Sequence, residues 1–234
     1  PSRRRRFVKI GAWLVAIVAV VVVANLAGVD IIAWLQSVWD QIKEVPPQYI
    51  VFATILQILQ WKNPRKRWLL KAPEHQVHLD TLLQVYPDAR IVQTHRDPIV
   101  CMASTTSLMG TLYYMRSDQP FNAQLFDNII MGEATAQRLE HVIRQREQGI
   151  VPAANITDSR YQDLMDDPLG CIARIYAHFG MPLSGVARQR MQQYLADKPK
   201  GKFGAHRYVV DEMRGRERPM FRRYQSLYGV PSEI

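Results

Sequence analysis

Cysteine is scarce in this chain, which contains only Cys101 and Cys171. The two residues do not show the close, paired spacing of zinc-binding cysteines, and two thiols are too few for a disulfide framework. The sequence therefore predicts two buried free thiols, no disulfide framework and no metal site.

Glycine is scarce before Lys71, where the chain has only Gly11 and Gly28, both inside an apolar run. A turn that wraps a phosphate with backbone N–H groups needs glycine, so the sequence offers no such turn in this region. The GxxxxGK[ST] motif is absent from the whole chain, which argues against a P-loop kinase.

Acidic residues are outnumbered, with 21 Asp and Glu against 30 Lys and Arg, which gives a formal net charge of +9. The excess includes the arginine run at residues 3–6 and a basic cluster within residues 198–223. Such an excess suits phosphorylated small molecules, anionic lipids or nucleic acid. No nucleic-acid-binding motif accompanies it, so we expect no nucleic-acid partner.

The longest uncharged apolar run covers residues 10–29 and follows a cluster of basic residues. Its length matches the hydrocarbon core of a bilayer, which predicts a transmembrane helix with a cytoplasmic N-terminus. A cleaved signal peptide and a buried soluble helix are the alternatives. Residues 49–61 form a second, shorter run that suits a membrane hairpin, an interfacial helix or a packed helix. We expect a membrane location, with one span or a hairpin.

Beyond residue 60 the pattern changes to alternating strand and helix signals, which indicates a membrane-associated segment at 1–60 and an α/β domain at 61–234. Residues 67–71 and the stretch that begins at Ile91 suit strands, with a helix at 73–86 between them. This order is typical of a parallel sheet. A further short strand is expected at 153–157. Further helices are expected at residues 99–116, 121–148, 168–179, 184–196 and 213–228, the last interrupted near Pro219.

The most informative stretch is RIVQTHRDPIVCMASTTS, at residues 90–107. Its strand must stop at Asp97 and Pro98, where the aspartate can cap a new helix and the proline suits its first turn. Arg96 then lies where a strand ends and a helix begins, a place where α/β sheets bind ligands and helix N-termini attract anions. Ser104 follows about two helical turns later and can reach the same anion. An ion pair of Arg96 with Asp97 or a helix end is the alternative.

KAPEH at residues 71–75, YPDARIVQTHRDP at 86–98, and Ser104 together resemble the sulfotransferase family that uses 3′-phosphoadenosine 5′-phosphosulfate (PAPS), especially its bacterial branch. The resemblance covers residues 59–229. It implies an α/β fold of the P-loop-NTPase-like sulfotransferase type with a parallel sheet, here incomplete and preceded by the transmembrane helix. It also implies that Arg96 and Ser104 hold the 3′-phosphate of PAPS.

The same resemblance implies two catalytic residues. Lys71 would stabilise charge on the leaving phosphate, and His75 would take the proton of the acceptor. A histidine that only bonds backbone at a helix start is the alternative for His75, and His78 is a weaker rival for the base. For His95 we favour a strand side chain packed against a helix.

Further cofactor contacts are implied later in the chain. Tyr161 resembles the family tyrosine near the adenine, with a core or interface tyrosine as the alternative. The segment GKFGAHRY, which starts at Gly201, resembles the basic glycine segment that covers the 3′-phosphate. The resemblance therefore points to Lys200, Gly201 and Lys202, with Arg207 as a further candidate.

These residues imply a membrane-tethered enzyme that moves a sulfuryl group from PAPS to a hydroxyl or amine of a small-molecule, glycan or lipid acceptor. The phosphosulfate loop that the family carries near its N-terminal end is not found before Lys71. The alternative is therefore a truncated or fused remnant without catalysis, which keeps the 3′-phosphoadenosine site or serves as a membrane-associated interaction protein.

Overall fold

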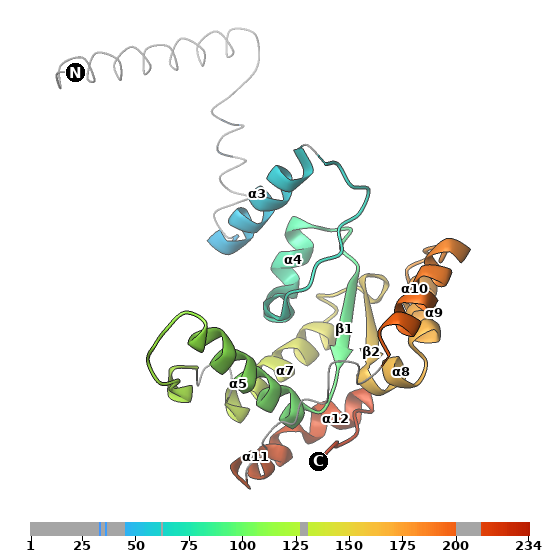
Figure 1. The fold of residues 1–234 in the computed structure, drawn as a ribbon. Coiled ribbons are helices and arrows are strands. Elements are labelled where there is room, and N and C mark those ends of the chain that lie inside the picture. Colours follow the sequence, from blue (N-terminus) through green and yellow to red (C-terminus); the bar gives the residue numbers. More distant parts are fainter. Residues whose placement is uncertain (1–32, 34–35, 37–44, 62, 127–130, 200–211) are drawn as a thin grey trace, which may run out of the picture. The chain divides into compact units, whose positions relative to one another are not determined.

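The structure is a computed structural model that describes residues 33, 36, 45–61, 63–126, 131–199 and 212–234 (Figure 1). By its internal contacts the chain divides into two units, residues 1–69 and residues 70–234. The predicted transmembrane segment at 10–29 and the glycine segment at 200–204 lie outside the described residues.

The described part of the first unit is dominated by helix α3, Pro47–Trp61. The side chain of Gln60 ties the following chain to the end of this helix, because its amide donates to the Arg65 carbonyl at 2.8 Å and its oxygen accepts from Arg65 N at 2.9 Å. Trp68 Nε1 donates to the same oxygen at 3.1 Å. Several apolar side chains of α3, among them Ile58 and Trp61, remain exposed.

Among the described residues no helix is both long and apolar enough to cross a membrane, which contradicts the prediction of a membrane location for this part of the chain. Helix α3 has 15 residues, which at 1.5 Å per residue gives a length of about 22 Å. The hydrocarbon core of a bilayer is about 30 Å thick. The second apolar run therefore forms a helix that is too short for the hairpin.

The second unit is built around two parallel strands, β1 (Ile91–His95) and β2 (Ile156–Arg160). They pair in register from Ile91 opposite Ile156 to His95 opposite Arg160. Strand β1 is preceded by η1 (Pro73–His78) and α4 (Leu79–Val85). The crossover from β1 to β2 contains α5 (Pro98–Tyr114), η2 (Ala123–Phe126), α7 (Gly132–Glu147) and η3 (Ala153–Asn155).

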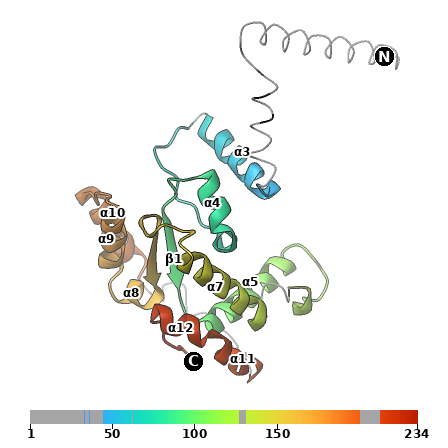
Figure 2. The same cartoon turned by 180° about the vertical axis from the view of Figure 1, so that it is seen from behind.

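Helix α7 lies against the face of the strands that Figure 2 turns toward the viewer. Its Val142 joins Leu79, Val151 and Ile156 in one buried cluster. The next residue, Ile143, packs with Tyr224 and Val230 in another. One helix thus connects the strands with the last part of the chain, and a third buried cluster of Ile99, Met102 and Phe221 adds α5 to the same packing.

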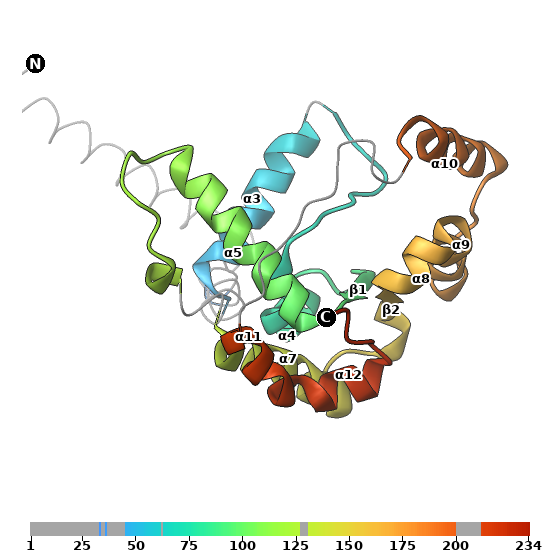
Figure 3. The same ribbon diagram turned by 60° about the horizontal axis from the view of Figure 1, so that its bottom comes forward.

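After β2 the chain forms only helices within its described part: α8 (Tyr161–Asp166), α9 (Pro168–His178), α10 (Gly185–Asp197), α11 (Glu212–Glu217), η4 (Arg218–Phe221) and α12 (Arg222–Tyr228). The expected interruption near Pro219 is confirmed, because a 3-10 turn separates α11 from α12. Figure 3 shows these two helices in a row beside α7. The chain then continues through residues 230–234, which form no helix or strand.

The predicted strand at residues 67–71 is wrong. These residues have no regular structure, and the side chain of Leu69 is 99% exposed. A strand needs a neighbour to pair its backbone N–H and C=O groups, and the sheet of the described residues contains only β1 and β2. The parallel strand–helix–strand unit therefore consists of β1, α5, α7 and β2, whereas the expected unit began with a strand at residues 67–71 and ended with the strand at Ile91.

Three smaller expectations also change. The helix expected at 121–148 is described as η2 and α7, with residues 127–130 between them not described. The strand expected at 153–157 begins at Ile156 and extends to Arg160, and residues 161–166 then form α8. Cys171 is buried as predicted, whereas Cys101 is exposed on α5, because its neighbours Met102 and Ala103 occupy the inward face.

Candidate functional site

The junction between β1 and α5 forms as the sequence predicts. Asp97 Oδ1 accepts a hydrogen bond from Ile99 N at 3.0 Å, and Pro98 occupies the first helical position. The side chain of Asp97 is buried and is bound a second time by Arg218, whose Nη2 lies 3.2 Å from Oδ2. Asp97 is thus a cap that also anchors η4.

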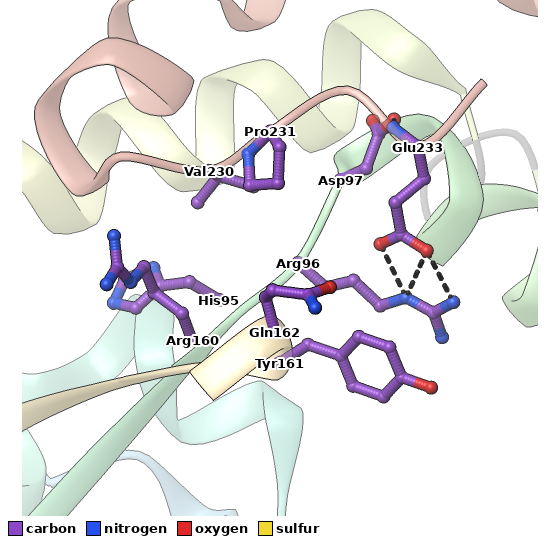
Figure 4. Close-up of a pocket in the computed structure, with 9 residues that line it drawn as sticks. All are labelled: His95, Arg96, Asp97, Arg160, Tyr161, Gln162, Val230, Pro231 and Glu233. Atoms are coloured by element: carbon purple, nitrogen blue, oxygen red, sulfur yellow. Dashed lines mark hydrogen bonds and ion pairs between the residues drawn. The ribbon is translucent and has the colours of Figure 1, made fainter. Parts of the chain in front are cut away.

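Arg96 leaves the end of β1 and meets two partners that lie far away in the sequence (Figure 4). Its guanidinium donates from Nε to both oxygens of Glu233, at 2.8 and 3.1 Å, and from Nη2 to Oε2 at 2.7 Å. Its Cζ lies 3.9 Å from the ring centroid of Tyr161. The hydrogen bond to Glu233 raises the pKa of Arg96, although burial lowers it. From the sequence, Asp97 is an alternative ion-pair partner of Arg96, whereas the structure pairs Arg96 with Glu233.

Strand register explains why Arg96 and Tyr161 meet. His95 and Arg160 are paired as the last residues of β1 and β2. The residues that follow each strand, Arg96 and Tyr161, therefore emerge side by side at the carboxyl edge of the parallel pair, where α/β sheets bind ligands. The pocket at this edge is lined by His95, Arg96, Asp97, Arg160, Tyr161, Gln162, Val230, Pro231 and Glu233.

A buried polar network lies next to this pocket and is centred on His95, whose side chain is 0% exposed. Its Nε2 lies 2.8 Å from Asp158 Oδ1 and its Nδ1 lies 2.9 Å from the hydroxyl of Tyr224. The ring stacks on Tyr228 with centroids 4.1 Å apart. The prediction that His95 packs against a helix is thus confirmed, and that helix is α12.

Arg146 completes the network from α7, because its Nη1 and Nη2 lie 2.6 and 2.9 Å from the two oxygens of Asp158. Burial alone would raise the pKa of Asp158, but hydrogen bonds from Arg146 and His95 outweigh it and hold the pKa well below its ordinary value. Sequence reasoning missed Arg146, Asp158 and Glu233, because nothing adjacent to them signals their partners.

This lowered pKa makes the stability of the fold depend on pH. The ionised form of Asp158 is favoured in the folded state, so its contribution is present above the unfolded pKa of about 3.9 and is lost as the pH falls toward the folded value. We expect Asp158→Asn to lower the free energy of unfolding at neutral pH by about 1–2 kcal/mol, a figure reduced for partial solvent exposure.

Urea unfolding of the wild type and of Asp158→Asn, at neutral pH and near pH 3, measures this effect. The stability difference between the two proteins should shrink at the lower pH, because the Asp158 carboxylate becomes protonated in the unfolded state while it stays ionised in the folded state. The exposed Asp80→Asn serves as the control with the same chemical change. A difference that stays constant with pH would contradict the interpretation.

Among the described residues, three further predicted site residues, Ser104, Lys71 and His75, do not line the pocket of Figure 4. Ser104 is half-buried in α5, and Lys71 is exposed in the irregular chain before η1. His75 lies in η1, where burial and the neighbouring His78 lower its pKa against the opposing effect of Glu74. A lowered pKa keeps an imidazole neutral at neutral pH, as a general base requires. The roles of these three residues stay predictions.

Lys200, Gly201, Lys202 and Arg207 lie outside the described residues, so their roles also stay predictions. Of the predicted cofactor residues, the structure brings together Arg96 and Tyr161. In the part of the chain that is described, no group of three or more His, Cys, Asp or Glu side chains is placed to hold a metal ion.

Comparisons with known proteins agree on one family. Residues 40–185 match the model described as "Sulfotransferase family". The chain is 28% identical over 187 residues to the omega-hydroxy-beta-dihydromenaquinone-9 sulfotransferase Stf3 of Mycobacterium bovis and of Mycobacterium tuberculosis, with 71% of this chain and 47% of each relative covered. The chain thus spans about half the length of the curated relatives it matches.

Solved structures show the same relationship. The sulfotransferase STF9 from Mycobacterium avium superposes with a TM-score of 0.58 and 29% identity, over 76% of this chain and 45% of that one. The sulfotransferase STF1 from Mycobacterium tuberculosis H37Rv gives a TM-score of 0.54 and 32% identity, over 70% and 41% of the two chains. The small parallel sheet and its helices therefore have the α/β sulfotransferase fold.

Proposed function

Because the chain belongs to the sulfotransferase family, we propose that it takes part in sulfuryl transfer from PAPS to an acceptor hydroxyl or amine. The observation that carries the proposal is the pairing of Arg96 with Tyr161 at the carboxyl edge of β1 and β2. A guanidinium fork stacked over an aromatic ring can bind the phosphate and the base of one nucleotide.

The nucleotide end of PAPS would be held by this pair. The fork of Arg96 matches two oxygens of the 3′-phosphate, and the ring of Tyr161 offers an apolar face to the adenine. The hydroxyl of Ser104 would add a donor to the same phosphate. Lys200, Gly201 and Lys202 would cover it with ammonium groups and backbone N–H groups.

The transfer step breaks the bond between sulfur and the bridging oxygen of the phosphosulfate and forms a bond between sulfur and the acceptor oxygen or nitrogen. The released phosphate oxygen gains negative charge, which the ammonium of Lys71 would stabilise. The acceptor loses a proton, which the neutral imidazole of His75 would accept. Lys71 would thus stabilise the developing charge, and His75 would act as the base.

For the acceptor we propose a hydroxyl group on an apolar molecule. The two curated relatives are named for an omega-hydroxy-beta-dihydromenaquinone, which is a lipid-like compound that carries a hydroxyl. A glycan acceptor would lack this apolar character.

Two measurements on the purified chain test the proposal. Calorimetric titration with 3′-phosphoadenosine 5′-phosphate should show binding with a dissociation constant on the order of micromolar. Incubation with PAPS carrying labelled sulfate and a panel of hydroxylated quinones should move the label to a quinone. Absence of binding would overturn the nucleotide site. Binding without any transfer would instead favour a remnant that keeps only the 3′-phosphoadenosine site.

A further inference from the structure

The anion site at Arg96 already contains an anion that belongs to the chain itself. The carboxylate of Glu233 accepts three hydrogen bonds from the guanidinium, at 2.7 to 3.1 Å (Figure 4). A carboxylate and a phosphate can each present two oxygens to an arginine fork. The guanidinium cannot offer the same donors to Glu233 and to a phosphate at once.

The backbone around Glu233 is held in place by contacts that do not involve its side chain. Glu233 N donates to Asp97 Oδ2 at 2.8 Å. Arg218 donates to Ser232 Oγ and to the Ile234 carbonyl oxygen, both at 2.6 Å. Val230 is buried beside Ile143 and Tyr224. The segment 230–234 would therefore stay docked when the carboxylate of Glu233 moves away.

The path of the chain into the pocket also depends on Gly229, which ends α12 with a φ of +61°. This left-handed conformation strains residues that carry a Cβ, whereas glycine adopts it readily. It turns residues 230–234 back toward the end of β1, so that Pro231 and Glu233 line the pocket with Arg96. The conformation of Gly229 at the end of α12 therefore helps to place the Glu233 carboxylate beside Arg96.

We propose that Glu233 is an internal competitor for the phosphate site, whose carboxylate must leave Arg96 before the 3′-phosphate of the nucleotide can bind. The proposal rests on the proposed function, because it requires that Arg96 binds this phosphate. Both side chains of the pair are 28% exposed, so water and ligand can reach the ion pair. The competitor lowers the affinity for every ligand that needs Arg96 and leaves other ligands unaffected.

Glu233→Gln is the direct test, because glutamine keeps the shape of the side chain and removes its charge. We expect the affinity for 3′-phosphoadenosine 5′-phosphate to rise by about 10-fold. The affinity for adenosine 5′-phosphate, which lacks the 3′-phosphate, should change by less than about twofold, because the gain arises at the 3′-phosphate alone. Calorimetric titration of both nucleotides against the full chain measures the two affinities.

Glu147→Gln is the matched control, because Glu147 also pairs with an arginine, Arg223 at 2.7 Å, and lies outside this pocket. It removes one negative charge and should leave both affinities unchanged. If wild type and Glu233→Gln bind 3′-phosphoadenosine 5′-phosphate equally, the competitor proposal alone fails. A weaker affinity of Glu233→Gln would show that Glu233 positions Arg96 and would also overturn the proposal. If neither protein binds the nucleotide, the proposed function fails with it.

Discussion

Replacement of Lys71 by alanine is expected to slow sulfuryl transfer by about 100-fold or more. Negative charge accumulates on the leaving phosphate as the sulfur–oxygen bond breaks, so an ammonium at this position binds the transition state more strongly than the bound donor. The loss should appear in kcat, with a smaller change in the KM for PAPS. Steady-state kinetics with labelled PAPS and a hydroxylated quinone measures both parameters.

Lys66 supplies a matched control for this variant. It is an exposed lysine five positions before Lys71 in the sequence, so Lys66→Ala removes the same charge from a nearby position of the chain. Its transfer rate should stay within about twofold of the wild type. Lys71→Arg keeps the charge but changes its geometry, and we expect it to recover part of the rate. A wild-type rate in Lys71→Ala would remove Lys71 from the mechanism.

Replacement of Arg96 by alanine is expected to weaken binding of 3′-phosphoadenosine 5′-phosphate by about 10- to 100-fold, the usual effect of losing charge-assisted hydrogen bonds. Arg96→Lys should recover only part of the affinity, because an ammonium cannot bind two phosphate oxygens as a fork. Calorimetric titration gives the affinities. Thermal unfolding of each variant checks that the loss of the Glu233 partner leaves the fold intact.

Arg174→Ala controls for the change in net charge, because Arg174 is an exposed arginine 4.0 Å from Asp167 and lies outside the pocket. A double variant adds a stricter test. If Glu233 acts by occupying Arg96, the gain in affinity from Glu233→Gln should vanish when Arg96 is already alanine. Unchanged nucleotide binding in Arg96→Ala would refute the phosphate site at the end of β1.

Features that depend on neighbouring residues were predictable from the sequence. The cap of α5 needs only Asp97 and the backbone N–H of Ile99. The cap of α9 likewise joins Asp167 to Gly170, and that of α10 joins Ser184 to Ala187. Each bond spans two or three residues, so the pattern of side chains along the chain contains all the information that the cap requires.

The strand expected at residues 67–71 shows where this reasoning stops. An apolar run indicates that side chains can be buried, but it does not show whether a neighbouring strand is present to pair with its backbone. In the structure that partner is missing from the described residues, and the run is irregular and exposed. The same limit applies to Cys101, whose exposure depends on which face of α5 packs inward.

By itself, the sequence determined the helix caps, the strand before Arg96 and the motifs that resemble sulfotransferases. The tertiary structure alone decided which groups surround Arg96. Tyr161 arrives through the register of β1 and β2, and Glu233 arrives from 137 positions away through the turn after α12. Caps need only neighbours in the chain, whereas these contacts require the pairing of the two strands and the packing of α7 against α12.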